Sequence, residues 1–261
     1  MDPEEFDRMY ALEGSHWWFA GKRRAASTLL PFDRHSTSVR RVLDVGCGTG
    51  GMLELLLGAY GKAFGVDLSP HAVRYTRQRG QKNTGLASVL ALPFGGDAFD
   101  LVTSFDVLYH QWVSDDLTAL RECARVLRPG GWLLVADSAF PFLWSRHDEL
   151  CRARQRYTAT ELRARVEEAG LLVHRLSYMN TALFPVVTVM RLWSRRFRSA
   201  RPGASDQPGA SDLRPLPGWL NALLKAIYLL EASLLRWVSY PFGVSVVCLA
   251  RKPAVPPRDK A

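Results

Sequence analysis

A glycine-rich stretch, residues 42–51 (VLDVGCGTGG), carries the residue types best suited to hold a ligand. The apolar residues at 42–45 predict a buried strand, and a helix is predicted to begin at about Met52. Glycine tolerates positive φ and lets a ligand lie against bare backbone, while a helix N-terminus offers unpaired N–H groups. The spacing therefore predicts a ligand-binding turn between a strand and a helix.

Two classes of ligand fit this turn. Gly46, Gly48 and Gly51 satisfy G-x-G-x-x-G, the pattern that cradles a pyrophosphate in dinucleotide-binding folds. Asp44 favours a cationic ligand instead, because a carboxylate attracts an ammonium group and repels phosphates. Asp44 with the glycines at 46, 48 and 50 resembles the first motif of class I S-adenosylmethionine-dependent methyltransferases. The resemblance implies S-adenosyl-L-methionine as the methyl donor, with contacts from Asp44, Gly46, Cys47, Gly48 and Gly50.

A second carboxylate, Asp67, ends the next predicted strand, residues 63–67. An acidic residue at roughly this distance after the glycine turn reaches a ribose in dinucleotide folds. Since NAD and S-adenosylmethionine both carry adenosine, Asp67 predicts a nucleoside without distinguishing them. Leu68 is expected to contact the donor as well, and Ser69 and Pro70 predict the N-cap and first residue of the following helix.

The third strand and its turn are predicted within residues 86–94. This segment resembles the part of the methyltransferases in which an acidic side chain and the next backbone N–H recognise adenine. Ser88 stands at the acidic position, and its hydroxyl can still bond the exocyclic amine. Further donor contacts are expected from Val89, Ala91, Leu92 and, after the fourth predicted strand, Phe105.

The loop that follows the fourth strand brings together Asp106, Tyr109 and His110. His110 is the candidate general base, because its ordinary pKa lies near neutrality, and Asp106 is the second catalytic candidate. Tyr109 is a candidate contact of the methyl acceptor. Alternatively, His110 only packs the donor, since many methyl transfers need mainly alignment and desolvation of two reactants.

Residues 120–131 (LRECARVLRPGG) closely resemble the same segment of a large bacterial methyltransferase group that includes quinone-biosynthesis enzymes. The resemblance covers most of positions 40–138. It implies an α/β fold with a Rossmann-like, mostly parallel seven-stranded sheet and a terminal antiparallel strand. The core is expected to span residues 37–178, including a helix at 158–169, and its last strand residues 243–253.

The N-terminal arm, residues 1–36, is predicted to be a helical lid over the donor site. Trp17 and Trp18 are candidate acceptor contacts, because aromatic faces attract a sulfonium and exclude water. The alternative is that these aromatic residues only pack the arm onto the core. The block from Glu13 to Phe19, E-x-x-H-W-W-F, also resembles the N-terminal block of some small bacterial methyltransferases.

Residues 179–242 are expected to form a helical cap inserted before the last strand. A repeated PGASD motif predicts a mobile linker at 200–216. Residues 219–238 have the length of a membrane span, but Lys225, Glu231 and Arg236 would be costly in lipid. A helix packed on the core or lying on a membrane surface is therefore predicted. One face of it is expected to carry Leu220, Leu223, Leu224, Ile227, Leu230, Leu234 and Val238.

Glu231 falls near the middle of that apolar face, where an unpaired charge is costly. It is expected either to pair with an arginine of the core or the arm, or to orient a hydroxyl or amine of the acceptor.

Composition limits the remaining possibilities. The 261 residues carry a net charge of +9, with a run of arginines at positions 191–201 that is either solvated surface or a contact for an anionic membrane or phosphorylated substrate. Nucleic acid is ranked last, because no recognisable nucleic-acid module is present.

The four cysteines lie far apart, which predicts a reducing compartment and no metal site. The acidic N-terminus is no signal peptide, so a cytoplasmic protein is expected, at most peripheral to the inner membrane face, with a disordered tail at 254–261.

These observations favour methyl transfer to a small or lipid-linked metabolite, with O-methylation ahead of N- or C-methylation. Secondary-metabolite, glycoconjugate or quinone-type biosynthesis would supply such acceptors. Two alternatives stay open: a nicotinamide-dependent oxidoreductase, which should lack the terminal antiparallel strand, and a non-catalytic membrane-surface protein that keeps the nucleotide-binding fold.

Overall fold

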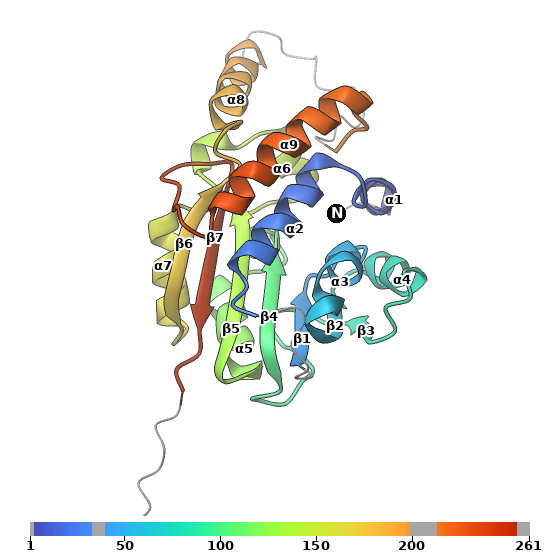
Figure 1. Ribbon diagram of the computed structural model, residues 1–261, viewed down its shortest axis with the longest axis vertical. Coiled ribbons are helices and arrows are strands. Elements are labelled where there is room, and N and C mark those ends of the chain that lie inside the picture. Colours follow the sequence, from blue (N-terminus) through green and yellow to red (C-terminus); the bar gives the residue numbers. More distant parts are fainter. Residues whose placement is uncertain (1–2, 33–39, 199–212, 255–261) are drawn as a thin grey trace, which may run out of the picture.

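A computed structural model of the chain describes residues 3–32, 40–198 and 213–254. Within these residues, seven strands form one sheet in the order β3-β2-β1-β4-β5-β7-β6 (Figure 1). β7 runs antiparallel to both β5 and β6, whereas the other pairings are parallel. The predicted mostly parallel sheet with a terminal antiparallel strand is confirmed. The strands are β1 (Arg40–Val45), β2 (Gly61–Asp67), β3 (Thr84–Leu86), β4 (Phe99–Phe105), β5 (Leu127–Ser138), β6 (Leu172–Met179) and β7 (Ser245–Arg251).

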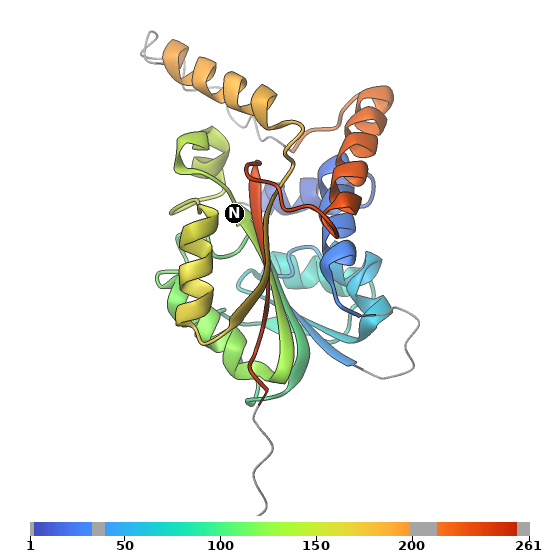
Figure 2. The same ribbon diagram turned by 60° about the vertical axis from the view of Figure 1, so that its left-hand side comes forward.

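Helices cover both faces of the sheet, so its central strands are buried on both sides. In β1, Val42, Leu43 and Val45 are at most 1% exposed, as expected for a parallel strand built from a continuous apolar run. The turned view in Figure 2 shows the two helical layers on either side of the sheet. One layer contains α5 (Asp116–Val126) and α7 (Ala159–Glu168), and the other α2 (Trp17–Leu29), α3 (Gly51–Leu55) and α9 (Gly218–Leu234).

Side-chain caps begin two of the helices at the predicted residues. The Ser69 hydroxyl accepts a hydrogen bond from the Ala72 N–H, and Pro70 is the first residue of α4 (Pro70–Gln78). Thr158 and Glu161 form a reciprocal capping box at the start of α7. Such caps satisfy N–H groups that the first helical turn leaves unpaired.

The prediction of the third strand within residues 86–94 is wrong, because β3 lies earlier, at Thr84–Leu86, and shares only Leu86 with that segment. Beyond β3, the backbone N–H groups that a longer strand would donate to a neighbouring strand donate instead to side chains or within a tight turn. The Ser88 hydroxyl accepts a hydrogen bond from Leu90 N at 3.2 Å, and Glu122 Oε2 accepts one from Leu92 N at 2.8 Å. Because serine and carboxylate groups compete for these donors, residues 87–94 form a loop.

The N-terminal arm and the insertion are both helical. α1 (Pro3–Leu12) and α2 precede the sheet, and α8 (Phe184–Arg198) and α9 lie between β6 and β7. The predicted tail at 254–261 and most of the predicted linker at 200–216 lie outside the described residues. The remaining short helices, which the sequence did not predict as separate elements, are η1 (Leu57–Tyr60), η2 (Pro141–Leu143) and α6 (Arg146–Leu150).

α9 packs on the core with a different side from the one predicted. Leu223 and Leu230 of the predicted face are 51% and 65% exposed, whereas Tyr228 and Leu235 are buried. The reason lies in α2, where a Cβ added at Gly21 would come within 1.9 Å of the Tyr228 ring. Since α9 is apolar on both sides, this close contact between a glycine and an aromatic ring selects the side that faces α2.

Candidate functional site

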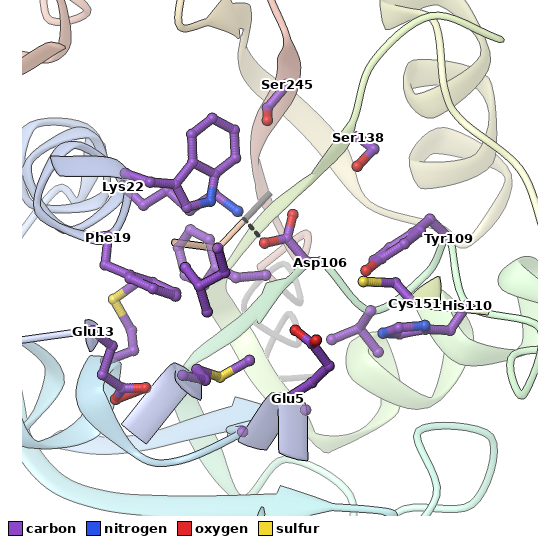
Figure 3. Close-up of a pocket in the computed structure, with 18 of the residues that line it drawn as sticks. Glu5, Glu13, Phe19, Lys22, Asp106, Tyr109, His110, Ser138, Cys151 and Ser245 are labelled. Carbon is purple, nitrogen blue, oxygen red and sulfur yellow. Dashed lines mark hydrogen bonds and ion pairs between the residues drawn. The ribbon is translucent and has the colours of Figure 1, made fainter. Parts of the chain in front are cut away.

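A cavity of about 920 Å³ opens at the carboxyl ends of the central strands. Ligands of open α/β sheets bind at this edge. Its walls come from the ends of β1, β2 and β4, from the N-terminal arm and from α8. Figure 3 shows that Glu13 and Lys22 of the arm lie on one side of the cavity and that Tyr109, His110 and Cys151 lie on the other.

The glycine turn after β1 leaves room for a ligand only because its residues lack side chains. Gly46, Gly48 and Gly50 all have positive φ, at 70°, 54° and 86°. A Cβ at Gly46 would lie 2.3 Å from Cγ2 of Val107. The Gly48 N–H donates to Asp67 Oδ2 at 2.9 Å, which joins the turn to the end of β2. The turn is therefore a fixed backbone surface that larger residues would obstruct.

Three carboxylates surround this turn: Asp44, Asp67 and Glu13. The pKa of Asp44 is raised to about 7. Burial is the main cause and the charges of Asp67 and Glu13 add to it, whereas a hydrogen bond from Thr103 Oγ1 at 2.6 Å lowers the pKa. Burial also raises the pKa of Asp67, although N–H groups of Ser69 and Gly48 oppose the shift. The pKa of Glu13 is raised by burial too. Such a site favours a cation and disfavours further negative charge.

Glu13 joins the N-terminal arm to the glycine turn. Its Oε2 accepts a hydrogen bond from Thr49 Oγ1, and its Oε1 lies 3.5 Å from Arg79 Nη2. Oε1 is buried and makes no hydrogen bond within the described residues. A Cβ at Gly51 would lie 1.8 Å from this oxygen, so the oxygen lies directly against the first turn of α3. A buried acceptor without a hydrogen bond beside the turn suits a donor group on a ligand.

The arm is also held against α4. Tyr10 stacks on Tyr75 with ring centroids 4.6 Å apart, and Arg79 donates through Nη2 to the Tyr10 carbonyl at 2.9 Å. The arm thus covers the side of the cavity that contains the glycine turn.

The middle of the cavity holds an ion pair between Lys22 and Asp106 (Figure 3). Lys22 is 3% exposed, and its Nζ lies 4.6 Å from the centre of the Trp18 ring. Asp106 has φ 55°, a conformation uncommon outside glycine, and its N–H donates to the Ala136 carbonyl at 2.9 Å. Strained backbone of this kind often lies at functional sites.

A second carboxylate, Asp137, lies behind this ion pair. Burial and the charge of Asp106 raise its pKa to about 8, although N–H groups of Ser138 and Leu108 donate to it. The ion pair in the cavity is therefore backed by a second carboxyl group, which is fully buried and does not line the cavity.

His110 lies on the wall opposite the arm, stacked on Tyr109 with ring centroids 4.2 Å apart. Burial lowers its pKa to about 4, so the imidazole is neutral at pH 7. Its Nδ1 is buried and has no hydrogen-bond partner among the described residues. Nearby, the Cys151 thiol lies 3.5 Å from His147 Nε2, and burial raises its pKa to about 12. In the described part of the chain, no three His, Cys, Asp or Glu side chains are grouped to hold a metal.

The sequence of this chain is similar to those of known proteins. The family described as a methyltransferase domain matches residues 43–135. The ubiquinone biosynthesis O-methyltransferase of Xanthomonas oryzae pv. oryzae is 35% identical over 146 residues, 51% of this chain and 59% of that enzyme. The O-methyltransferase rstn1 of Aspergillus nomiae is 32% identical over 153 residues, 52% of this chain and 67% of that protein. This chain belongs to the class I S-adenosylmethionine-dependent methyltransferases.

A solved structure shows how far the methyltransferase fold extends along the chain. A chain of the complex between the Haloferax volcanii Trm112 methyltransferase activator and the putative methyltransferase is 24% identical, with a TM-score of 0.60. The similarity in fold covers 97% of this chain and 98% of that one. The antiparallel β7 also argues against a nicotinamide-dependent oxidoreductase, which is expected to lack that strand.

The structure brings most of the predicted site residues of the methyltransferase to one cavity. Its lining includes Asp44, Gly46, Cys47, Gly48, Asp67, Leu68, Ser88, Val89 and Phe105 among the predicted donor contacts, and Asp106, Tyr109, His110, Trp17 and Trp18 among the others.

Four predicted residues, Gly50, Ala91, Leu92 and Glu231, do not line the cavity. Gly50 instead faces α4, where a Cβ would lie 2.9 Å from Thr76 Cγ2. The N–H of Leu92 is taken by Glu122, and that of Ala91 by the Ser88 carbonyl at 3.2 Å.

Glu231 links two elements of the insertion instead of pairing with an arginine or facing the cavity. Its Oε2 accepts a hydrogen bond from the Ala182 N–H at 2.9 Å, just before α8, and Oε1 has no partner within the described residues. No basic side chain of those residues forms an ion pair with it. A backbone N–H takes the place of the expected cation.

Several residues of the site were not predicted. Lys22 belongs to a Lys-Arg-Arg run, which by itself indicates either solvated surface or contact with an anionic partner, although it follows Trp18 by one helical turn. His147 of α6 and Cys151, which follows the last residue of α6, also line the cavity. In the sequence, only their spacing of about one helical turn indicates that they lie on the same side of a helix. Glu13 was noted only as part of a family-like block.

Proposed function

We propose that this chain transfers a methyl group from S-adenosyl-L-methionine to an oxygen of a small or lipid-linked acceptor. The observation that carries the proposal is the group of three buried carboxylates, Asp44, Asp67 and Glu13, around a turn of bare backbone. A donor with an ammonium and a sulfonium group relieves their mutual repulsion. The pyrophosphate of NAD would add two negative charges to the same place.

The residues of the turn have separate roles in this proposal. Asp44 and Oε1 of Glu13, which accepts no hydrogen bond from the described residues, bind the ammonium group, and Asp67 accepts hydrogen bonds from the ribose hydroxyls. Ser88 and the backbone at Val89 contact adenine. Because Cβ atoms at Gly46 or Gly51 would collide with Val107 or Glu13, the backbone there can approach the donor closely only as glycine.

The bound donor supplies an electrophilic methyl group. The acceptor oxygen attacks its carbon in line, the S–CH3 bond breaks as the O–CH3 bond forms, S-adenosylhomocysteine leaves, and the hydroxyl proton is released to bulk water. The arm and Trp18 exclude water, and the wall of Tyr109 and His110 positions the acceptor. Nδ1 of neutral His110 accepts a hydrogen bond from the acceptor hydroxyl. A pKa of about 4 makes His110 a weak proton acceptor, so its proposed role is orientation.

An oxygen acceptor is favoured because the two relatives described above are named as O-methyltransferases, one of them acting in ubiquinone biosynthesis. Aromatic and aliphatic side chains along the cavity suit a ring or chain that carries a hydroxyl.

The test is transfer of label from S-adenosylmethionine tritiated in the methyl group to a simple ortho-dihydroxybenzene and, separately, to phenolic lipids in vesicles. We expect label in the organic phase with at least one acceptor, released as methyl iodide by hot hydriodic acid, which cleaves methyl ethers. Gly46→Val is the matched negative control. Label that resists the acid would show C-methylation, and donor binding without transfer to any acceptor would contradict the proposed activity.

A further inference from the structure

α9 has a second apolar side that faces away from the protein. Trp219, Leu223, Leu230 and Leu234 of α9 are all exposed, and so is Trp237, which follows the last helical residue by three positions. At 100° per residue the four helical positions fall on one side of α9, opposite the side that packs on α2. We call these five residues the α9 stripe. Soluble surfaces rarely carry so many large apolar side chains together, so the stripe requires a partner.

α8 has a similar exposed side, formed by Val186, Val189, Met190 and Trp193. We call these residues the α8 stripe. The neighbouring Val187, together with Met190, lines the cavity. α8 therefore lies at the edge of the cavity with apolar side chains both inward and outward. Figures 1 and 2 show α8 and α9 at the same end of the molecule, with α8 extending away from α9 in the turned view.

The sequences of the two helices contain more basic than acidic residues. The sequence of α8 contains four arginines and no acidic residue. α9 contains one acidic residue, Glu231, which is buried. On the exposed side of the helix pair, Arg24 of α2 and Arg236 flank the α9 stripe, and Arg24 donates to the Ser233 hydroxyl at 2.9 Å.

We propose that the α8 and α9 stripes dock on the surface of a bilayer that contains anionic phospholipids. Apolar side chains flanked by basic ones are typical of helices that lie in the membrane interface, and tryptophan is enriched at that depth. Within the described residues, no helix is long and apolar enough to cross a membrane. A second copy of the chain would bring two positive surfaces together, whereas anionic headgroups neutralise them.

Docking in this way also indicates the class of acceptor. Since Val187 and Met190 of α8 line the cavity, the mouth of the cavity faces the bilayer when the α8 stripe is in contact with it. An amphiphile with its hydroxyl-bearing head at the membrane surface could enter without crossing water. This step, unlike the docking itself, rests on the proposed methyl transfer.

The test is flotation of the full chain with vesicles of phosphatidylcholine alone or of phosphatidylcholine and phosphatidylglycerol at three to one. We expect binding to the anionic vesicles and little to the neutral ones.

Leu230→Ser should weaken that binding about threefold or more, and the double variant Trp219→Ser with Trp237→Ser about tenfold or more, because the apolar area buried in the bilayer is lost. The matched control is Leu172→Ser, because Leu172 is 61% exposed, close to the 65% of Leu230, but is the first residue of β6, at the other end of that strand from α8. The control should bind like the wild type.

Binding of S-adenosylhomocysteine, measured on each variant, shows that it is folded. Wild type that ignores both kinds of vesicle, or that binds neutral vesicles equally well, overturns the proposal. The proposal is also overturned if light scattering shows that the wild type is a dimer, Leu230→Ser is a monomer, and neither protein binds vesicles. Failure to bind vesicles while methyl transfer to a water-soluble acceptor persists would remove the docking and leave the proposed activity intact.

Discussion

Asp44→Asn should make the unliganded protein more stable and, at the same time, weaken its binding of the donor. In the folded chain the pKa of Asp44 is raised from 3.8 to about 7, first by burial and then by the charges of Asp67 and Glu13. A carboxyl whose pKa is raised by folding stabilises the protein at low pH, and this stabilisation is lost as pH rises through about 7. At pH 8 the wild type therefore carries an unfavourable buried charge that asparagine does not.

The size of the effect follows from the shift. About three pKa units correspond to about 4 kcal/mol as an upper bound, because one unit is about 1.4 kcal/mol. Asparagine Oδ1 can still accept the hydrogen bond that Thr103 Oγ1 donates to Asp44 at 2.6 Å. For a chain of this size, 4 kcal/mol raises the melting temperature at pH 8 by about 8–16 °C. Loss of a charged hydrogen bond to the donor ammonium should cost about 1.5–3 kcal/mol of affinity, roughly ten- to a hundredfold.

Calorimetry and thermal melts at pH 6, 7 and 8 measure both effects. Because the donor ammonium requires ionised Asp44, wild-type affinity for S-adenosylhomocysteine should rise about tenfold from pH 6 to pH 8, with protons released on binding at pH 6. Asp44→Asn should bind weakly and with little dependence on pH. An unchanged melting temperature at pH 8 together with wild-type affinity would refute both the raised pKa and the assigned contact.

Asp67→Ala should abolish or sharply weaken binding of S-adenosylhomocysteine, because hydrogen bonds to a charged group, each worth about 1.5–3 kcal/mol, are lost; unchanged affinity by calorimetry would remove Asp67 from the donor site. His110→Ala should lower turnover with donor affinity kept, and the wild-type rate should show no step near pH 6.5, because burial lowers the pKa of His110 to about 4. A step near pH 6.5 that disappears in His110→Ala would restore His110 as a general base. Glu231→Gln keeps an acceptor for the Ala182 N–H, so melting temperature and donor affinity should change little, whereas Glu231→Leu should lower the melting temperature as the hydrogen bond is lost. Equal melting temperatures for the two variants would contradict the linking role of Glu231.

The parts of the site that the sequence predicted correctly depend on short stretches of chain. The glycines after β1 need positive φ at positions a few residues apart, so their pattern is visible in ten letters of sequence. Ser69 with Pro70, and Thr158 with Glu161, identify helix starts through contacts that span three residues. Asp44 and Asp67 end apolar strands, and parallel strands bring their carboxyl ends to one edge.

The residues that were missed or misplaced depend on contacts between distant parts of the chain. Glu13 meets Thr49 across 36 positions and Lys22 meets Asp106 across 84, and no local pattern specifies either contact. For α9, apolar residues on both sides left its orientation undetermined, and the fit of Tyr228 onto Gly21 decides it. The same orientation explains why Glu231 bonds to a backbone N–H and not to an arginine.

The central claim, that the carboxylate-lined turn holds a cationic methyl donor, is tested most directly by titrating the chain with S-adenosylmethionine, S-adenosylhomocysteine and NAD in one calorimeter at pH 8. We expect saturable one-to-one binding of the first two and none of NAD at the same concentrations. Gly46→Val, whose side chain would collide with Val107 beside the turn, should bind none of the three. Binding of NAD in preference to S-adenosylmethionine, or no binding of either sulfur compound by the folded wild type, would show that the turn does not hold a cationic methyl donor.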